Sequence, residues 1–122
     1  LRDNFFDIPS DCPQRDERLG WMGDAQVFSW TAAFNRETAL FFTKWMRDIS
    51  AASSLERGVP HIVPDIQGTY SSAAWSDAAV IIPWVVYQTY GDTRILEESW
   101  KCMHEWVDYI HNHVQQGKEK SV

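Results

Sequence analysis

The sequence predicts an all-helical fold, and three observations support this prediction. Apolar residues recur at three- and four-residue steps over four stretches, as they do on the buried face of an amphipathic helix. The connecting stretches show no sustained alternation of apolar and polar residues, so no strand is expected. The composition is globular, with 44% apolar and 23% charged residues in a chain of 122. We therefore expect one domain of four helices in two hairpins.

An irregular segment of 23 residues comes first. It contains two prolines, two glycines and many charged residues. Long loops inside compact domains tend to carry function. Asp24 then has the residue type of a helix N-cap, and apolar residues follow it at near-helical spacing. This pattern predicts a first helix over residues 25–34.

A second helix is expected over residues 37–53. Its buried stripe is predicted to consist of Leu40, Phe41, Trp45, Ile49 and Ala52. Gly58 follows this helix and is expected to help end it. Residues 59–65 contain two prolines, each of which disfavours helix at the preceding residue, so this segment should be extended.

A third helix is expected over residues 78–90, with Ser76 or Asp77 as its cap. It is apolar on nearly every side, which predicts burial all round. Pro83 should kink it or leave one carbonyl unpaired. Because a helix buried on every side needs more neighbours than three other helices supply, we expect these hairpins to be a piece of a larger ring or stack of helices.

Gly91 should end the third helix, and a fourth helix is expected over residues 94–114. The polar tail, residues 115–122, should fray. Four of the seven tryptophans follow helical stripes and are predicted to lie in the core: Trp45, Trp84, Trp100 and Trp106. Trp30 could be buried or exposed. A tryptophan-rich core is the simplest interpretation of this composition, and sugar stacking on exposed rings is the alternative.

Charge and hydropathy exclude several classes of partner. The net charge of −6 argues against a nucleic-acid or anionic-membrane surface. No apolar run approaches the ~18 residues of a membrane span, and no signal-peptide pattern is present. We therefore expect a soluble protein whose compartment the sequence does not identify. Cys12 and Cys102 are expected to be buried free thiols, and neither a metal nor another cofactor is expected, because no His or Cys spacing suits one.

Residues 11–24 hold the densest cluster of chemically active side chains. Two arginines, Trp21 and two glycines accompany four carboxylates, which are Asp11, Asp16, Glu17 and Asp24. Clustered carboxylates repel unless one is protonated or an arginine compensates, so at least one pKa should be raised. A protonated acid beside an ionised one is what acid-catalysed glycoside cleavage requires. The alternative is a solvated charged loop whose ion pairs stabilise little.

Residues 7–26, which read DIPSDCPQRDERLGWMGDAQ, resemble the signature of the α-L-rhamnosidases of glycoside hydrolase family 78. The resemblance continues through residues 42–45, 59–65, 75–84 and 90–92. A twenty-residue match of such unusual composition is far more specific than a short motif. The resemblance implies that residues 1–122 are the N-terminal part of an (α/α)6-barrel catalytic domain, a partial and truncated six-hairpin glycosidase fold.

The resemblance also implies an activity, which is hydrolysis of terminal non-reducing α-L-rhamnose residues with inversion. By position, Glu17 matches the general acid of the family. Four residues match those that surround the rhamnose hydroxyls: Asp11, Arg15, Asp16 and Asp24. Two more, Trp21 and Trp75, match aromatic walls of the pocket. The implied partner is a rhamnose-containing glycoside or polysaccharide.

An inverting enzyme also needs a general base, a second carboxylate ~6.5–9.5 Å from the acid. The family supplies it from a glutamate far downstream, and no residue here matches that glutamate. The glutamates at positions 97, 98, 105 and 119 fit the polar face of the fourth helix and the tail instead. We therefore expect this chain to be inactive alone and its uncovered apolar faces to favour self-association. Two alternatives stay open: another (α/α)6 glycosidase, or a non-catalytic helical fragment or sugar-binding scaffold.

Overall fold

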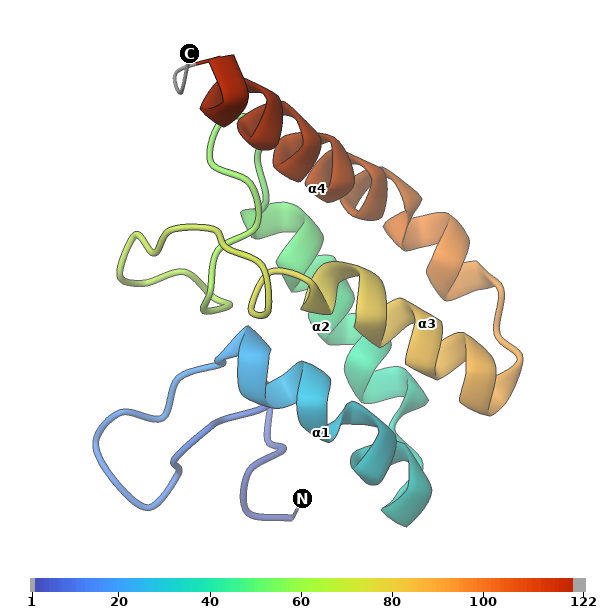
Figure 1. Cartoon of the computed structure of the whole chain (residues 1–122). Helices are drawn as coiled ribbons and strands as arrows, with labels where there is room; N and C mark the ends of the chain where they lie inside the picture. The colour runs from blue at the N-terminus through green and yellow to red at the C-terminus, as the bar shows by residue number, and fades with distance from the viewer. Residues whose placement is uncertain (1, 120–122) are drawn as a thin grey trace.

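The computed structural model describes residues 2–119, and within them the fold is all-helical, as predicted. The helices are α1 (Met22–Asn35), α2 (Ala39–Ala52), α3 (Ala78–Tyr90) and α4 (Arg94–Glu119). Helix α3 lies in the middle and packs against each of the other three (Figure 1). In the described part of the chain, β-structure is limited to three isolated bridges between loop residues.

The core forms where α2, α3 and α4 meet, and α1 contributes Met22 from its first turn. Its largest fully buried side chains include Phe42, Trp45, Ile49, Ile82 and Trp106. Trp45 and Trp106 are therefore buried, as predicted. The indole N–H of Trp45 donates to the carbonyl oxygen of Val63 at 3.2 Å. This bond satisfies the one polar atom of a buried indole and ties the loop after α2 to the core.

Other apolar side chains that were predicted to be buried are exposed. Trp84 and Trp100 keep 50% and 64% of their surface exposed, and Leu40 is also exposed. Helix α3 is not buried all round, because Ile81 and Trp84 lie on a face that the other described helices leave uncovered. Trp30 is about half exposed. Sequence periodicity identifies an apolar stripe, whereas the number of neighbouring helices decides whether that stripe is covered.

Helix α1 begins earlier than predicted, with Trp21 rather than Asp24 at the N-cap. The backbone N–H of Met22 donates to the carbonyl oxygen of His61 at 2.8 Å, and this bond from a distant segment marks the helix start. Asp24 lies in the first turn instead, where a negative charge is favourable near the helix N-terminus. The expected capping role of Asp24 is therefore wrong.

Helix α3 has the predicted bounds and continues through Pro83. It ends at Gly91, whose φ of 68° is in the left-handed region that glycine adopts easily. Asp77 occupies the N-cap position, but its side chain makes no capping bond. Its carboxylate accepts the backbone N–H of Ala74 at 2.8 Å and the indole N–H of Trp106 at 2.9 Å. Asp77 therefore connects α4 to the segment that precedes α3.

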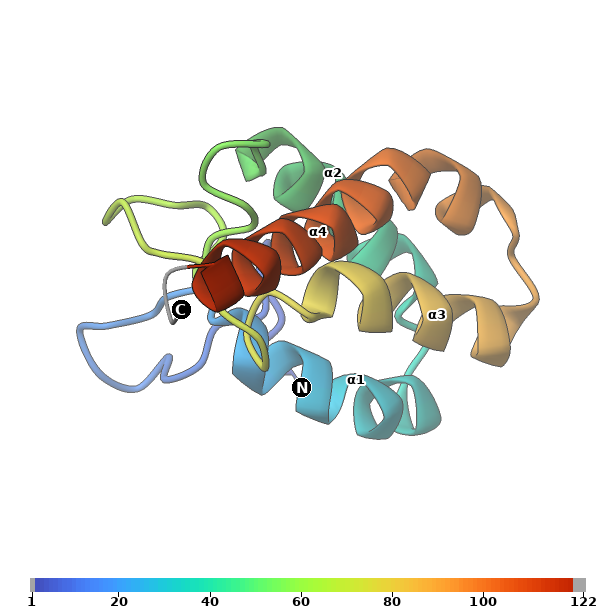
Figure 2. The ribbon, with the colours of Figure 1, turned by 45° about the horizontal axis from the view of Figure 1, so that its top comes forward.

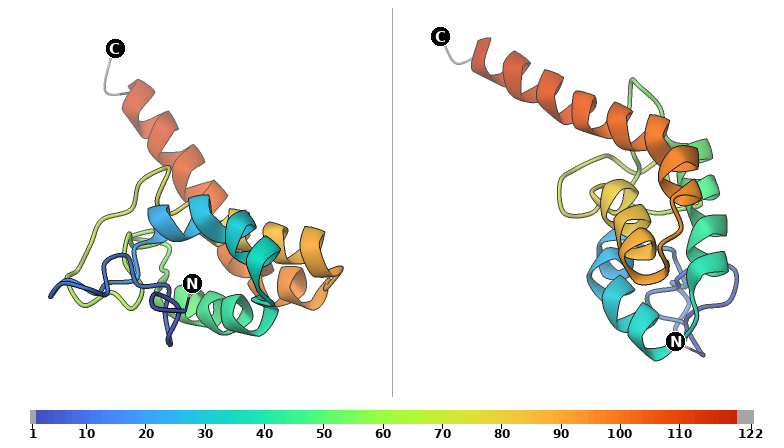
Figure 3. Two further views of the ribbon diagram at one scale, coloured as in Figure 1. Left: turned by 90° about the horizontal axis from the view of Figure 1, so that it is seen from below. Right: turned by 90° about the vertical axis from the view of Figure 1, so that its right-hand side faces the viewer.

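Helix α4 extends beyond the other helices, and its C-terminal half projects away from them (Figure 3). It is helical to Glu119, so it continues five residues beyond its predicted end at residue 114. Residues 120–122 of the predicted tail lie outside the described residues. None of the described helices combines the length and apolar character that a membrane crossing requires. Cys102 is buried in α4 and Cys12 is half-buried, and both thiols are free.

Two long loops, residues 2–20 and 53–77, lie at the same side of the helices (Figures 1 and 2). They meet where Trp21 pairs with Ile62 in an isolated antiparallel bridge. The segment over residues 59–65 is non-helical, but it bends at residues 59, 61, 63 and 64, so the prediction that it is extended holds only in part. This meeting point positions the residues of the candidate site.

Candidate functional site

A short backbone ladder joins the two loops at the entrance to α1. The N–H of Val63 donates to the carbonyl oxygen of Gly20 at 2.9 Å, one residue before the Trp21 bridge. A β-carbon at Gly20 would overlap the carbonyl oxygen of Val63, so only glycine allows the two backbones to approach this closely. The ladder therefore fixes where Trp21 stands.

Glu17 is held by two donors, one on each carboxylate oxygen. The indole N–H of Trp21 donates to Oε1 at 2.8 Å, and a terminal N–H of Arg15 donates to Oε2 at 2.7 Å. The side chain of Glu17 is 32% exposed and that of Arg15 is 62% exposed. The structure thus brings together three of the predicted site residues, with the carboxylate partly accessible to solvent.

Asp11 closes the loop that carries Glu17. Its backbone N–H donates to the carbonyl oxygen of Leu19 at 3.0 Å, and the Leu19 N–H donates to its Oδ1 at 3.0 Å. Burial on its own would raise the pKa of Asp11, but hydrogen bonds from the Cys12 amide and thiol and from the Leu19 amide outweigh it and lower the pKa. For Asp11 the shift is therefore opposite to the increase expected from carboxylate clustering.

One group of potential metal ligands occurs among the described residues. One atom each of Asp11, Cys12 and Glu17 lies within 4.8 Å of the others. The hydrogen bond to Asp11 is the main cause of a raised pKa for the Cys12 thiol. Groups of acidic residues like this one are common without a metal ion, so the cluster does not by itself make a metal centre. We assign no metal to this group. Its distances show that the carboxylates of Asp11 and Glu17 lie close together.

Arg18 and Asp16 have different surroundings from Arg15 and Glu17. Arg18 adopts a φ of 49°, and its Nε donates to the carbonyl oxygens of Pro13 and Arg15. Its guanidinium therefore holds the loop backbone. Asp16 is exposed and is not among the residues that line the pocket described next.

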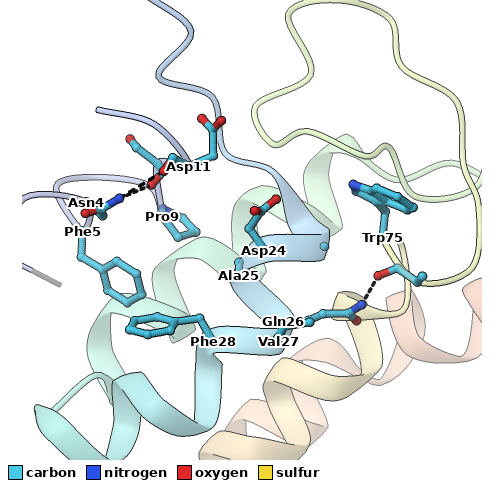
Figure 4. Close-up of a pocket in the computed structure, with 13 residues that line it drawn as sticks. Asn4, Phe5, Pro9, Asp11, Asp24, Ala25, Gln26, Val27, Phe28 and Trp75 are labelled. Atoms are coloured by element: carbon cyan, nitrogen blue, oxygen red, sulfur yellow. Dashed lines mark hydrogen bonds between the residues drawn. The ribbon is translucent and has the colours of Figure 1, made fainter. Parts of the chain in front are cut away.

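A pocket of about 710 Å³ adjoins this loop, and three predicted site residues line it. Asp11 comes from the first loop, Asp24 from the first turn of α1, and Trp75 from the segment before α3 (Figure 4). The structure therefore brings Asp11, Asp24 and Trp75 to one pocket. Glu17, Arg15 and Trp21 are not among the residues that line this pocket, and Glu17 is related to it through Asp11, whose carboxylate approaches that of Glu17 to within 4.8 Å.

Trp75 is supported from two sides. A β-carbon added at Gly23 would lie 3.0 Å from two atoms of the Trp75 ring, so the indole lies against the helix start. The ring of His61 lies 5.5 Å from the Trp75 ring, and its Nε2 is 2.7 Å from the Ser72 hydroxyl. Burial lowers the pKa of His61, which favours the neutral imidazole.

Sequence reasoning missed other residues of the pocket. Asn4 donates to the carbonyl oxygens of Ser10 and Asp11, and Gln26 donates to that of Ala74. Phe5 and Phe28 form the apolar side, with ring centroids 6.4 Å apart (Figure 4). Gln26 could have been found from the sequence, because it is a polar residue at the end of the unusual stretch of residues 7–26. The phenylalanines carry no such signal, because they meet only in the folded chain.

The arrangement is suited to a small polyhydroxylated ligand. Carboxylates accept hydroxyl hydrogen bonds, while an indole face packs against apolar C–H groups. Glu17 is a partly exposed carboxyl group next to Asp11, and a group of this kind can exchange a proton with a ligand that reaches it.

Comparisons with known proteins point to one family. The model of the bacterial α-L-rhamnosidase six-hairpin glycosidase domain matches residues 1–122. The chain is 50% identical over 109 residues to an α-L-rhamnosidase of Formosa agariphila, covering 88% of this chain and 12% of that protein. It is 41% identical over 113 residues to one of Streptomyces avermitilis, covering 92% of this chain and 11% of that protein.

Solved structures of similar sequence have the same local fold. The Streptomyces avermitilis α-L-rhamnosidase complexed with L-rhamnose matches with a TM-score of 0.87 at 40% identity, over 90% of this chain and 11% of that one. The α-L-rhamnosidase of Dictyoglumus thermophilum matches with a TM-score of 0.86 at 39% identity, over 89% of this chain and 12% of that one. The chain thus spans only about an eighth of the length of these relatives.

Proposed function

The chain belongs to the family of bacterial α-L-rhamnosidase six-hairpin glycosidase domains, and we propose that it supplies the acid side of the active site of an enzyme that hydrolyses terminal α-L-rhamnosides. The observation that carries this proposal is the position of Glu17, which is held by Trp21 and Arg15 next to Asp11, a residue that lines the pocket. The four described helices form part of the six-hairpin domain.

Glu17 is proposed as the general acid. Its protonated carboxyl group gives its proton to the glycosidic oxygen while the bond between that oxygen and the anomeric carbon breaks. Water attacks the anomeric carbon from the opposite face, which inverts its configuration. Partial exposure of the Glu17 side chain leaves room for the leaving group to reach it.

The sugar is proposed to occupy the pocket beside Glu17. Asp11 and Asp24 accept hydrogen bonds from its hydroxyl groups, and Trp75 packs against its apolar face and methyl group. Contacts of the sugar with Trp21, Arg15 and Asp16 rest on the resemblance alone, since none of these three residues lines the pocket.

The general base is proposed to come from a segment of the enzyme outside these 122 residues. Asp11 is not suited to that role, because its carboxylate approaches Glu17 to within 4.8 Å. An inverting pair is separated by ~6.5–9.5 Å to leave space for the attacking water. The oxygens of Asp11 are also engaged by the Leu19 amide and by Cys12.

Replacement of Glu17 in the full-length enzyme tests the proposal. Glu17→Gln should lower kcat on a phenyl α-L-rhamnoside by at least ~10²-fold, with rhamnose affinity nearly unchanged. A dinitrophenyl rhamnoside, whose leaving group needs little protonation, should lose far less. Glu97→Gln is the matched control, since Glu97 is exposed on α4.

Each other outcome would contradict a specific part of the proposal. Equal cleavage of phenyl rhamnoside by Glu17→Gln and wild type would move the acid elsewhere. An equal loss on both substrates would indicate a binding or folding defect instead of acid catalysis. No rhamnoside cleavage by the wild type would favour another sugar or a non-catalytic scaffold.

A further inference from the structure

Ala74 adopts a backbone conformation that residues with a β-carbon avoid, and it directly precedes Trp75. Its φ of 71° lies in the left-handed region, where a β-carbon crowds the carbonyl oxygen that follows it. Both residues line the pocket proposed for the sugar. Such strained conformations persist only where the surrounding structure holds them, and they cluster at functional sites. The contacts that hold Ala74 therefore bear on how Trp75 is placed.

Two side chains from different parts of the chain hold the peptide groups of Ala74. Oδ2 of Asp77 accepts the Ala74 N–H at 2.8 Å, and Nε2 of Gln26 donates to the Ala74 carbonyl oxygen (Figure 4). Gln26 belongs to α1, whereas Asp77 is the N-cap residue of α3. Because the N–H and the carbonyl group lie on the two sides of the Ala74 α-carbon, the two bonds together restrict both φ and ψ of this residue.

Both holding side chains are anchored in the fold. Gln26 is 9% exposed, and its Oε1 is buried without a hydrogen-bond partner among the described residues. An unpaired buried oxygen lowers stability, so the contribution of Gln26 to the core does not explain its amide group. Asp77 accepts, through its other oxygen, the indole N–H of the buried Trp106. The conformation of Ala74 is thus tied to α1 on one side and to α4 on the other.

The turn that contains Ala74 is closed at both ends. The N–H of Ser76 donates to the carbonyl oxygen of Ser72 at 3.0 Å, and the Ser76 hydroxyl accepts the N–H of Ser72 at 3.2 Å. A relaxation of Ala74 toward negative φ therefore has to be compensated within residues 73–75. Because Trp75 is the next residue, this compensation changes the direction of its side chain.

Packing contacts place the Trp75 ring at one side of the pocket. A β-carbon at Gly23 would stand 3.0 Å from two ring atoms, and the His61 ring lies 5.5 Å from the Trp75 ring. These contacts stop the ring from moving closer to its neighbours, but they do not stop it from turning away from them. The orientation of the ring therefore also depends on the backbone, and so on the conformation of Ala74.

Resting on the proposed sugar site, we propose that Gln26 and Asp77 are positioning residues, which hold Ala74 in the left-handed region and so keep the Trp75 ring in place for the sugar. Gln26 acts through the Ala74 carbonyl group, and Asp77 acts through the Ala74 N–H. The alternative is that Gln26, which lines the pocket, contacts the sugar itself. The two roles predict different responses to substitutions at residue 74.

Gln26→Met in the full-length enzyme removes the donor with little change in side-chain volume. It also removes the unpaired oxygen, so we expect the fold to be retained, which circular dichroism checks. KM for phenyl α-L-rhamnoside should rise by about 10-fold, the upper range for one neutral hydrogen bond, while kcat changes little. Gln88→Met, the same substitution at an exposed position of α3, is the matched control and should change neither constant.

The same substitution in an Ala74→Gly background separates the two roles. Glycine adopts positive φ without strain, so residue 74 then needs the Gln26 bond less to stay in the left-handed region. Relative to Ala74→Gly alone, Gln26→Met should therefore raise KM by ~3-fold or less, because the two residues are coupled. An equal rise in both backgrounds would mean that Gln26 acts on the sugar directly. That result, or an unchanged KM in the wild-type background, would overturn the positioning role.

Two further substitutions test the conformation of residue 74 without changing Gln26. Valine and asparagine are similar in size, but valine is β-branched and fits the left-handed region poorly, whereas asparagine tolerates it. Ala74→Val should raise KM by about 10-fold and Ala74→Asn by ~3-fold or less, since only valine drives φ away from positive values. Ala74 is exposed, so neither variant places a new group in the core. Equal increases would show that bulk rather than φ determines KM, and would overturn the proposal.

The wild-type activity separates a failure of this inference from a failure of the proposed function. If the wild type cleaves the rhamnoside and the predicted differences between variants are absent, only the positioning role fails. If the wild type cleaves no rhamnoside, the proposed function fails, and the positioning role fails with it.

Discussion

The indole ring of Trp75 lies against the backbone of Gly23, so close that a β-carbon on Gly23 would stand 3.0 Å from two ring atoms. The two residues belong to different loop-to-helix junctions, at the start of α1 and before α3. His61 lies on the ring as well, at 5.5 Å between centroids. The absence of a side chain at residue 23 therefore helps to set how far Trp75 reaches into the pocket.

Gly23→Ala should displace Trp75 and weaken sugar binding. The added methyl group overpacks the contact, and overpacking typically costs 1–3 kcal/mol, which the ring can relieve by moving. We expect KM for a rhamnoside to rise by about tenfold, corresponding to ~1.4 kcal/mol, with kcat little changed. Steady-state kinetics of the full-length enzyme measure both. An unchanged KM, with the fold intact by circular dichroism, would mean that Trp75 is not a wall of the sugar site.

Gly20→Ala should destabilise the protein more strongly than a glycine replacement elsewhere. Its β-carbon would overlap the backbone carbonyl of Val63, which cannot move without breaking the ladder to residues 61–63. We expect a loss of about 3 kcal/mol in the free energy of unfolding, at the upper end for overpacking. Thermal unfolding of the variant and the wild type measures it.

Gly68→Ala is the control for this prediction. Gly68 has a φ of 66° and no atom within 4 Å of its β-carbon position, so only backbone strain of about 1 kcal/mol is expected. If Gly20→Ala and Gly68→Ala lower the free energy of unfolding equally, the overlap with the Val63 carbonyl costs no more than the backbone strain at Gly68.

Trp106→Phe should destabilise the contact between α4 and the segment before α3. The indole N–H of Trp106 donates to Oδ1 of Asp77 at 2.9 Å, and phenylalanine would leave that oxygen without this donor. We expect a loss of about 1–3 kcal/mol in the free energy of unfolding, measured in urea. Trp84→Phe, on an exposed indole, should cost far less. In an Asp77→Ala background this hydrogen bond is absent, so Trp106→Phe should cost less free energy of unfolding there. An equal loss in both backgrounds would mean that the hydrogen bond is not the cause.

Local signals account for the parts of the fold that could be predicted from sequence. Helix α3 has the predicted bounds because an apolar run and Gly91 define it locally. The predicted start of α1 is three residues late, because the bond from Met22 to His61 comes from a segment far along the chain. Trp84 and Trp100 follow helical stripes, but periodicity alone does not tell which stripe has a neighbouring helix.

Part of the candidate site could likewise be predicted from the sequence, and part could not. Glu17, Arg15 and Trp21 lie within seven residues of one another, so their motif could be recognised in the sequence, and their side chains do meet. The direction of the Asp11 pKa shift could not be predicted, since amide and thiol hydrogen bonds set by the loop conformation determine it. The contact of Trp75 with the start of α1 likewise exists only in the folded chain.

Asp65 should make the stability of the fold sensitive to acid. Its side chain is 8% exposed and accepts the N–H of Thr69 at 2.9 Å. Burial on its own would raise its pKa, but hydrogen bonds from Thr69, Gln67 and Gly68 outweigh burial and lower the pKa. A lowered pKa in the folded state means that Asp65 stabilises the fold above the unfolded value of about 3.8, and that this contribution is lost as the pH falls through the folded value.

Asp65→Asn, which cannot ionise, should therefore be less stable than the wild type at pH 7, and the difference should shrink between pH 5 and pH 2. Urea unfolding at pH 7, 5, 3 and 2 measures it. Asp3→Asn, at an exposed position of the first loop, is the control and should change the stability at none of these pH values. If the stability difference between wild type and Asp65→Asn stays constant down to pH 2, neutralising the wild-type carboxyl group has no effect. The neighbours of Asp65 would then not stabilise its ionised form.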